Sequence, residues 1–245
     1  MIAATAVLIS LAFAAQPAAD SPKYDLTALS GKTVLVDPGH NGGNAAHPDE
    51  INKLVPAGGF KKACDTTGTA TNDGKLSEAA FNWDVAKRLR KALRDAGAKV
   101  VFTRKDNKGV GPCINERAAI GNRAKADVAI SIHADGAPPR GRGFHVIYPG
   151  LVKGYTEDIL KPSRRLAVDT RGALDAGDHQ RSTYAGKKGL DKRTDLGGLN
   201  LSDVPKVLVE LGNMRSAKDA KLLESRSWRQ QTALDLRNGL AQFLT

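Results

Sequence analysis

The chain alternates between short apolar runs and longer segments in which apolar residues recur every three or four positions. Compact apolar runs, typical of buried strands, occur at residues 32–36, 99–103, 127–132, 143–148 and 206–211. Helical spacing occurs at residues 77–96, 114–125, 162–174 and 228–243, and Gly97 is placed to end the first of these helices. The alternation of strands and helices predicts a single α/β domain, with a mostly parallel twisted sheet and helices on both faces.

One long polar segment interrupts this pattern. Residues 41–76 are rich in Gly, Asn, Asp and Thr and show little periodicity, so we expect a long loop, which in compact domains is usually functional or mobile. The segment lies between two candidate site residues, His40 and Glu78. It is therefore expected to border a ligand groove, where it gates entry or grips the ligand. The alternative is a surface insertion without a role, which long loops tolerate at low free-energy cost.

The N-terminus has the pattern of a secretory signal. Residues 1–15 form an uncharged, mostly apolar run that is followed by small residues, and such a run is too short to span a bilayer comfortably. No Lys or Arg precedes it. We expect a signal segment at 1–19, a polar linker at 20–30 and the main folded domain at 31–245, in a protein exported to the periplasm, cell wall or extracellular space. The alternative is a buried N-terminal helix.

The cysteine count agrees with export. Cys64 and Cys113 are the two cysteines of the chain, and an even number in an exported protein favours one disulfide. A zinc site built on cysteines needs a close pair of them. No such pair exists, so any metal must be held by other side chains.

The net charge raises the question of an acidic partner. Charged residues make up 26% of the chain and the formal net charge is +11, a balance that often marks nucleic-acid binding. Here the Lys and Arg residues are spread along the chain without an aromatic-interleaved basic stripe, so no nucleic-acid partner is expected. For an exported protein the expected acidic partner is an anionic wall polymer or a membrane surface.

Three potentially reactive side chains follow the predicted strands. His40, His133 and Glu210 each lie where a run of apolar residues stops. Because ligands of open α/β sheets bind outside the carboxyl ends of the strands, we expect these three side chains at one edge of the sheet. Glu78 lies in the first turn of the long helix, where it either complements the helix dipole or acts as a metal ligand.

Two histidines and one glutamate with an open fourth position form a standard catalytic zinc site. His40, His133 and Glu78 are the candidates for such a set. The other histidines, His47, His145 and His179, do not repeat the pattern of a strand that stops at a histidine. They are not expected to bind metal.

Several sequence blocks resemble the zinc-dependent N-acetylmuramoyl-L-alanine amidases of the Amidase_3 family. The blocks are VLVDPGH at residues 34–40, SIHAD at 131–135 and VPKVLVELGN at 204–213, and further matches lie at 117–127 and 219–223. They occur in the family's order from about residue 32 to the end of the chain, which makes the match specific. The shortest block, LSEAAFN at residues 76–82, contains Glu78.

The resemblance implies a function and a set of roles. His40, Glu78 and His133 would hold Zn²⁺, and Glu210 would be the catalytic carboxylate. The substrate would be peptidoglycan and its muropeptides, cleaved at the amide between N-acetylmuramic acid and L-alanine during cell-wall turnover. A monomer is expected.

The chain also departs from the family pattern. The spacing between His40 and Glu78 is longer than usual, Cys64 lies within the extra length, and Ala134-Asp135 replaces the Asn-Ala of many members. These departures concern how the substrate is positioned. Two alternatives to the amidase stay open: a zinc peptidase or deacetylase acting on another bond of peptidoglycan, and a non-catalytic wall-binding protein on the same fold.

Overall fold

The structure is a computed structural model that describes residues 24–245, so the expected signal segment at 1–19 lies outside the described residues. Its helices and strands, in chain order, are η1 (Leu26–Leu29), β1 (Thr33–Pro38), η2 (Asn44–Ala46), α1 (Pro48–Ile51), β2 (Leu54–Pro56), β3 (Lys61–Ala63), α2 (Glu78–Asp95), β4 (Lys99–Phe102), α3 (Ile114–Arg123), β5 (Val128–Asp135), β6 (His145–Pro149), α4 (Leu160–Ala176), β7 (Leu190–Arg193), α5 (Gly197–Asn200), β8 (Lys206–Asn213), α6 (Ala217–Glu224) and α7 (Arg226–Leu244). None of these helices is long and apolar enough to cross a membrane.

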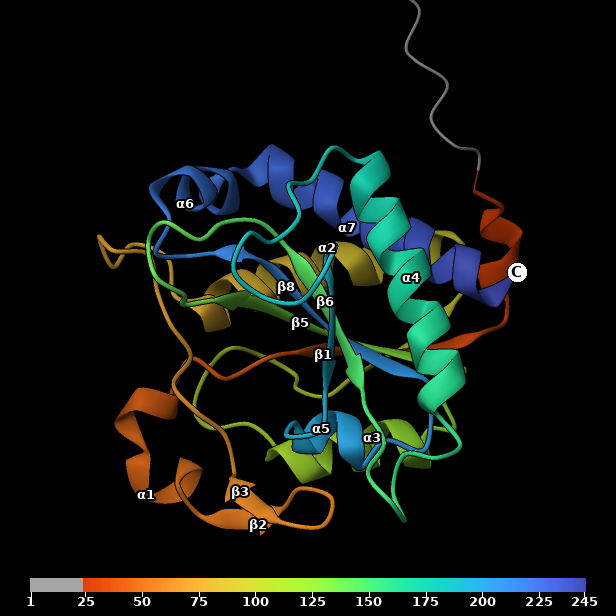
Figure 1. Cartoon of the computed structure of the whole chain (residues 1–245), viewed down its shortest axis with the longest axis horizontal. Coiled ribbons are helices and arrows are strands. Elements are labelled where there is room, and N and C mark those ends of the chain that lie inside the picture. Colours follow the sequence, from red (N-terminus) through yellow and green to blue (C-terminus); the bar gives the residue numbers. More distant parts are fainter. Residues whose placement is uncertain (1–23) are drawn as a thin grey trace, which may run out of the picture.

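A six-stranded sheet in the order β4-β1-β5-β8-β6-β7 forms the centre of the molecule (Figure 1). All neighbouring strands are parallel except β6 and β8, which are antiparallel. The predicted α/β fold with a mostly parallel sheet is therefore confirmed. A separate hairpin, β2-β3, lies below the sheet in Figure 1, near α1.

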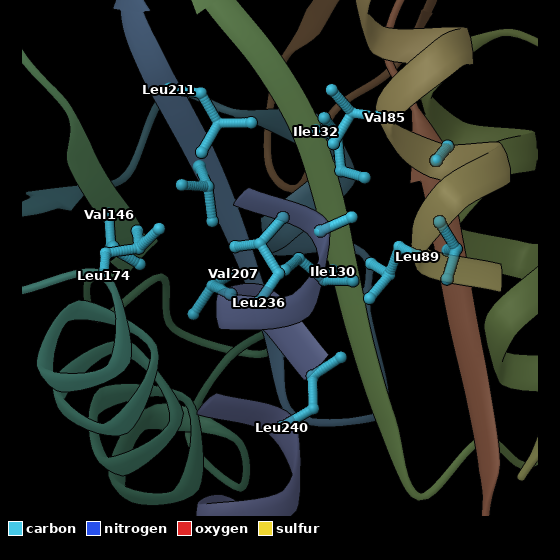
Figure 2. Packing of buried hydrophobic residues seen from close by; sticks show 14 of the residues in the cluster. Val85, Leu89, Ile130, Ile132, Val146, Leu174, Val207, Leu211, Leu236 and Leu240 are labelled. Atoms are coloured by element: carbon cyan, nitrogen blue, oxygen red, sulfur yellow. The ribbon is translucent and has the colours of Figure 1, made fainter. Parts of the chain in front are cut away.

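One face of the sheet carries the main hydrophobic core. Long helices α2, α4 and α7 cover this face, and their apolar side chains pack against alternate residues of the strands (Figure 2). On β8 these alternate residues are Val207, Val209 and Leu211, all of them buried. Because successive side chains of a strand point to opposite faces, Leu208 and Glu210 face the other side.

The opposite face is covered less completely. The short helices α3 and α5 and several loops lie against it (Figure 1), with a small apolar cluster of Leu35, Ala126, Ala129 and Val204. Helices therefore cover both faces, as predicted, but unequally. The thin cover leaves room for polar side chains of β1, β5 and β8 to line a hollow.

The elements that the sequence did not predict are short or polar. The segment 41–76 contains η2, α1 and the β2-β3 hairpin in place of one continuous loop. The stretch between α4 and β8, where no element was predicted, contains β7 and α5, and α6 follows β8. Within the expected linker, η1 packs against α7 and Leu29 is buried.

Candidate active site

The strand register brings the three predicted strand-end residues to one level of the sheet. His133 of β5 lies opposite Glu210 of β8, and His40 follows β1, whose Pro38 pairs with Ile132. Strands β5 and β8 continue for a few residues beyond His133 and Glu210, which differs from the expectation that they end there. The three side chains still gather near the carboxyl ends of the strands, as predicted.

Glu78 joins the two histidines. It is the first residue of α2, directly after Ser77, whose side chain accepts a hydrogen bond from Ala80 N and caps the helix. Glu78 Oε1 lies 3.2 Å from His40 Nε2 and 2.9 Å from His133 Nδ1. One potential ligand atom from each of the three residues falls within 4.8 Å of the others, an arrangement that suits a single ion.

Two glycines make this close approach possible. A Cβ atom at Gly39 would lie 2.1 Å from His133 Cε1, so any other residue there would displace the imidazole. Gly68 has a φ of +71°, and a Cβ atom on it would lie 2.8 Å from Glu78 Oε2. Position 68 therefore requires glycine both for its left-handed backbone and for space.

The pKa of Glu78 and the pKa of His40 depend on the charged groups beside them. Burial alone would raise the pKa of Glu78, but His40 and His133 hold the pKa of that carboxyl well below its ordinary value. Burial alone would lower the pKa of His40, but Glu78 and Asp65 raise the pKa of that imidazole to about 10. The negative charge of Glu78 is thus balanced by a proton on the neighbouring imidazole of His40. A divalent cation bound between these side chains can take the place of that proton.

A buried network behind His40 fixes its ring. Asp65 Oδ1 lies 3.0 Å from His40 Nδ1, and Arg117 Nη2 donates to Asp65 Oδ2 at 3.3 Å. Asp65 directly follows Cys64, which forms the predicted disulfide with Cys113, the N-cap residue of α3. Sequence reasoning missed Asp65, although its position beside a bridged cysteine was a usable signal. A carboxylate on the second nitrogen of a ligating histidine orients the ring and raises its basicity.

A second buried ion cluster lies beneath the site. Asp37 accepts hydrogen bonds from Arg117 Nη1 at 2.9 Å and from Lys206 Nζ at 3.0 Å. Burial alone would raise the pKa of Asp37, but Lys206 and Arg117 hold it far below its ordinary value. Ser131 Oγ also donates to Asp37. The cluster links β1, β5, β8 and α3 directly under the metal-ligand candidates.

Glu210 differs from the other carboxylates at this edge. Among the described residues its side chain accepts no hydrogen bond, and its Oε2 atom is buried without a partner. Burial, together with the negative charges of Glu78 and Asp135, raises the pKa of Glu210 well above its ordinary value. It is not part of the group of potential ligand atoms. A carboxyl group of this kind is suited to hold and release a proton.

These side chains line a hollow of about 390 Å³. Its walls include His40, Glu78, His133 and Glu210, together with Thr66, Gly68 and Thr69 of the long polar segment. A neighbouring hollow of about 190 Å³ shares His40 and His133 and continues over the sheet toward Lys206. The segment 41–76 therefore borders the site.

The remaining histidines fall into two groups. His47 Nδ1 pairs with Glu50 Oε1 in α1, and His179 Nε2 pairs with Asp235 Oδ2 of α7. Neither lines the hollow. His145 does line it, although it lies outside the group of potential ligand atoms.

Comparisons with known proteins place these features in a family. Residues 34–242 match the family model described as N-acetylmuramoyl-L-alanine amidase. The chain is 40% identical over 235 residues to N-acetylmuramoyl-L-alanine amidase Rv3717 of Mycobacterium tuberculosis, which covers 96% of this chain and 95% of that protein. The crystal structure of the N-acetylmuramyl-L-alanine amidase Ami1 from Mycobacterium smegmatis has a TM-score of 0.83 at 42% identity and covers 88% of this chain and 98% of that one. The apo form of Ami1 from Mycobacterium abscessus has a TM-score of 0.83 at 41% identity, with coverage of 88% and 100%.

Proposed function

The chain belongs to the N-acetylmuramoyl-L-alanine amidase family, and on this basis we propose that it is a zinc-dependent hydrolase of peptidoglycan. It cleaves the amide between the lactyl group of N-acetylmuramic acid and the L-alanine of the stem peptide. The proposal rests on one observation. Potential ligand atoms of His40, Glu78 and His133 lie within 4.8 Å of one another, and the carboxylate of Glu210, which is not one of these ligands, lines the same hollow.

His40, Glu78 and His133 would hold the ion. Two imidazole nitrogens and one carboxylate oxygen are a donor set that zinc favours in catalytic sites. The contact between Asp65 and His40 Nδ1 supports this assignment, because it leaves Nε2 of His40 free to face Glu78 and the ion. Zinc in such a set would act as a Lewis acid that polarises the amide carbonyl and lowers the pKa of the attacking water, so that the water gives up a proton near neutral pH.

Glu210 would be the catalytic base. It takes one proton from the attacking water while the new C–O bond forms at the lactyl carbonyl. It then passes this proton to the alanine nitrogen as the C–N bond breaks. Burial raises the pKa of Glu210, which makes its carboxylate a stronger proton acceptor for the first step. The second proton of the water leaves with the new carboxyl group and reaches the amine through solvent.

Product analysis with and without a chelator tests the proposal. A purified muropeptide incubated with the protein is expected to yield the intact stem peptide with a free L-alanine amino terminus, identified by mass spectrometry. A chelator should abolish this product, and zinc should restore it. Cleavage within the stem peptide or loss of acetyl groups would instead support the peptidase or deacetylase alternatives. No product under any condition would support a wall-binding protein.

The ligand assignment has its own test. Replacement of His40 or His133 with Ala is expected to abolish binding of about one zinc ion per chain, because either change removes one of three ligands. Metal analysis of the purified variants measures this. His47→Ala is the matched control, since His47 lies outside the hollow, and it should keep the full zinc content. A full zinc content in both ligand variants would contradict the assignment.

The place of action follows from the substrate. Several relatives are described as cell wall amidases, among them LytH of Staphylococcus epidermidis. We propose that this protein is exported by a signal at residues 1–19 and works in the wall or periplasm as a monomer. The segment 41–76 is proposed to gate or grip the substrate, because Thr66, Gly68 and Thr69 line the hollow.

A further inference from the structure

His145 lies next to the proposed base. It begins β6 and is the cross-strand partner of Glu210 on the antiparallel neighbour β8. Directly opposite residues of such a pair point to the same face of the sheet with their Cβ atoms only about 5 Å apart. His145 is 2% exposed and lines the same hollow as Glu210 and the metal-ligand candidates. Its imidazole is therefore part of the wall that faces the substrate.

The imidazole lacks the partner that a structural histidine has. Among residues 24–245 neither ring nitrogen of His145 makes a hydrogen bond, and Nδ1 is buried without a partner. His179, an equally enclosed imidazole of this protein, binds Asp235 at 2.9 Å. A buried polar atom without a partner is destabilising. The packing around His145 therefore holds a hydrogen-bonding group ready for a ligand.

The surroundings of His145 fix its ring and keep it neutral. Tyr184 meets it edge-on, with ring centroids 5.7 Å apart at an interplanar angle of 88°. Burial lowers the pKa of His145 more than Asp135 and Asp191 raise it, and Arg193 lowers it further. A neutral imidazole has one nitrogen that donates a hydrogen bond and one that accepts.

The order of the strands places Glu210 between His133 on β5 and His145 on β6. The attacking water belongs to the His133 side, where the metal-ligand candidates converge. The amine must leave beside Glu210, which protonates it. For that transfer the lone pair of the amine must face Glu210, so its N–H must point toward another acceptor.

We propose that His145 is a second catalytic residue, which accepts a hydrogen bond from the N–H of the leaving alanine nitrogen and so turns its lone pair toward Glu210. The inference rests on the proposed amidase function and on Glu210 as its base. The hydrogen bond between His145 and the alanine N–H strengthens as the alanine nitrogen becomes tetrahedral. Loss of that interaction should lower kcat more than it raises KM.

A pair of substrates separates this role from the alternatives. The first is a muropeptide with the natural amide, and the second is its ester analogue, in which L-lactate replaces L-alanine and the leaving oxygen carries no hydrogen. His145→Ala is expected to lower kcat on the amide on the order of 10²-fold, with KM within about threefold. On the ester, its kcat should stay within about threefold of the parental value, because no N–H is present to be oriented.

Further variants distinguish the loss of a hydrogen-bond acceptor from a change in folding. His145→Gln retains an accepting oxygen and should recover at least about tenfold of kcat on the amide over His145→Leu, a variant of similar size without an acceptor. His179→Gln is the matched control, a buried histidine outside the hollow, and should leave the ratio of amide to ester hydrolysis at the parental value. Zinc content and melting temperature are measured for each variant.

Two results would overturn the inference. Equal losses on amide and ester would mean that His145 acts on the carbonyl group or on the structure of the site. A parental kcat on the amide in folded His145→Ala would mean that it has no catalytic part. Failure of the proposed function is a separate outcome, because then the parental protein itself would release no alanine-terminated peptide.

Discussion

At the scale of single residues, Glu210 is distinguished by the hydrogen bonds it does not make. The neighbouring carboxylates of Glu78 and Asp65 each accept at least one hydrogen bond from a backbone N–H, which favours their charged form. Among the described residues Glu210 has no such donor, and burial raises its pKa. This is the environment of a group that exchanges a proton, in contrast to one that holds a fixed charge.

Replacement of Glu210 with Gln preserves its size and removes the base. We expect kcat to fall on the order of 10²-fold or more, while zinc content and melting temperature stay at their parental values. Turnover of a muropeptide and metal analysis measure the two effects. Glu224→Gln, on the exposed surface of α6, is the matched control. Near-parental turnover in a folded, zinc-loaded Glu210→Gln protein would remove Glu210 from the mechanism.

Asp37 shows the opposite behaviour, and its role in stability depends on pH. Lys206 and Arg117 hold its pKa far below the ordinary value in the folded state, whereas in the unfolded chain it titrates near 4. Its contribution to stability is therefore fully present above about pH 4 and is lost as the pH falls further. Asp37→Asn leaves the buried ammonium of Lys206 without its carboxylate partner and leaves Arg117 paired with Asp65 alone, which costs about 3–5 kcal/mol at pH 7.

Denaturant unfolding at several pH values checks this prediction. The difference in free energy of unfolding between the parental protein and Asp37→Asn should be largest at pH 7 and should shrink below about pH 4. Asp158→Asn, at an exposed position, should show no such difference. A difference that does not change with pH would mean that the charge of Asp37 is not what stabilises the cluster.

At the scale of elements, the Cys64–Cys113 disulfide joins the long polar segment to the start of α3. It closes a loop with a sequence separation of 49, which in the chain-entropy model stabilises the fold by about 4 kcal/mol. It also holds Asp65 between His40 and Arg117. The bridge should therefore stabilise both the fold and the geometry of a proposed zinc ligand.

Two variants separate these effects. The double variant Cys64→Ala, Cys113→Ala is expected to lose about 4 kcal/mol of stability and on the order of 10-fold or more in zinc affinity, as for loss of other partners of metal ligands. Asp65→Asn should lose a similar factor in affinity while it keeps the disulfide. Competition with a chelator and denaturant unfolding measure both. Parental zinc affinity in the double cysteine variant would show that the bridge acts on stability alone.

The elements also show what the sequence can predict. Strands β1, β5 and β8 bury compact apolar runs and helices α2 and α7 bury apolar residues at helical spacing, and these patterns predicted them. β7 reads LDKR and α5 reads GGLN, so neither has a periodic apolar pattern. Their conformation depends on pairing with β6 and on packing over the thin face of the sheet, which no local pattern encodes.

The same distinction applies to the site. His40, His133 and Glu210 were predictable because each follows an apolar strand, and the structure brings them together near the strand ends. His145 was not predicted as a site residue, because it lies inside the apolar run 143–148 and does not follow one; in the structure it begins β6. It reaches the same edge only because β6 runs antiparallel to β8. Strand direction is a tertiary property, so the sequence pattern alone pointed away from this histidine.

At the scale of the whole molecule, the net charge of +11 bears on how a cell-wall amidase reaches its substrate. Residues 1–19 contain no Lys, Arg, Asp or Glu, so removal of the expected signal would leave the charge unchanged. A positive protein is attracted to an anionic surface over a distance set by the Debye length, about 8 Å at physiological ionic strength. We therefore expect anionic wall polymers to raise the local concentration of the enzyme.

Binding to purified walls tests this expectation. Sedimentation of the catalytically inactive Glu210→Gln protein should show strong binding to walls that carry their anionic polymers and weaker binding to peptidoglycan stripped of them. The difference should diminish as salt rises from about 0.05 M toward 1 M, where the Debye length falls to about 3 Å. Turnover of a small uncharged muropeptide analogue should change little over the same range, because the charges that act are spread over the surface. Equal binding to both wall preparations at low salt would instead assign recognition to the hollow itself and leave the surface charge without a part in it.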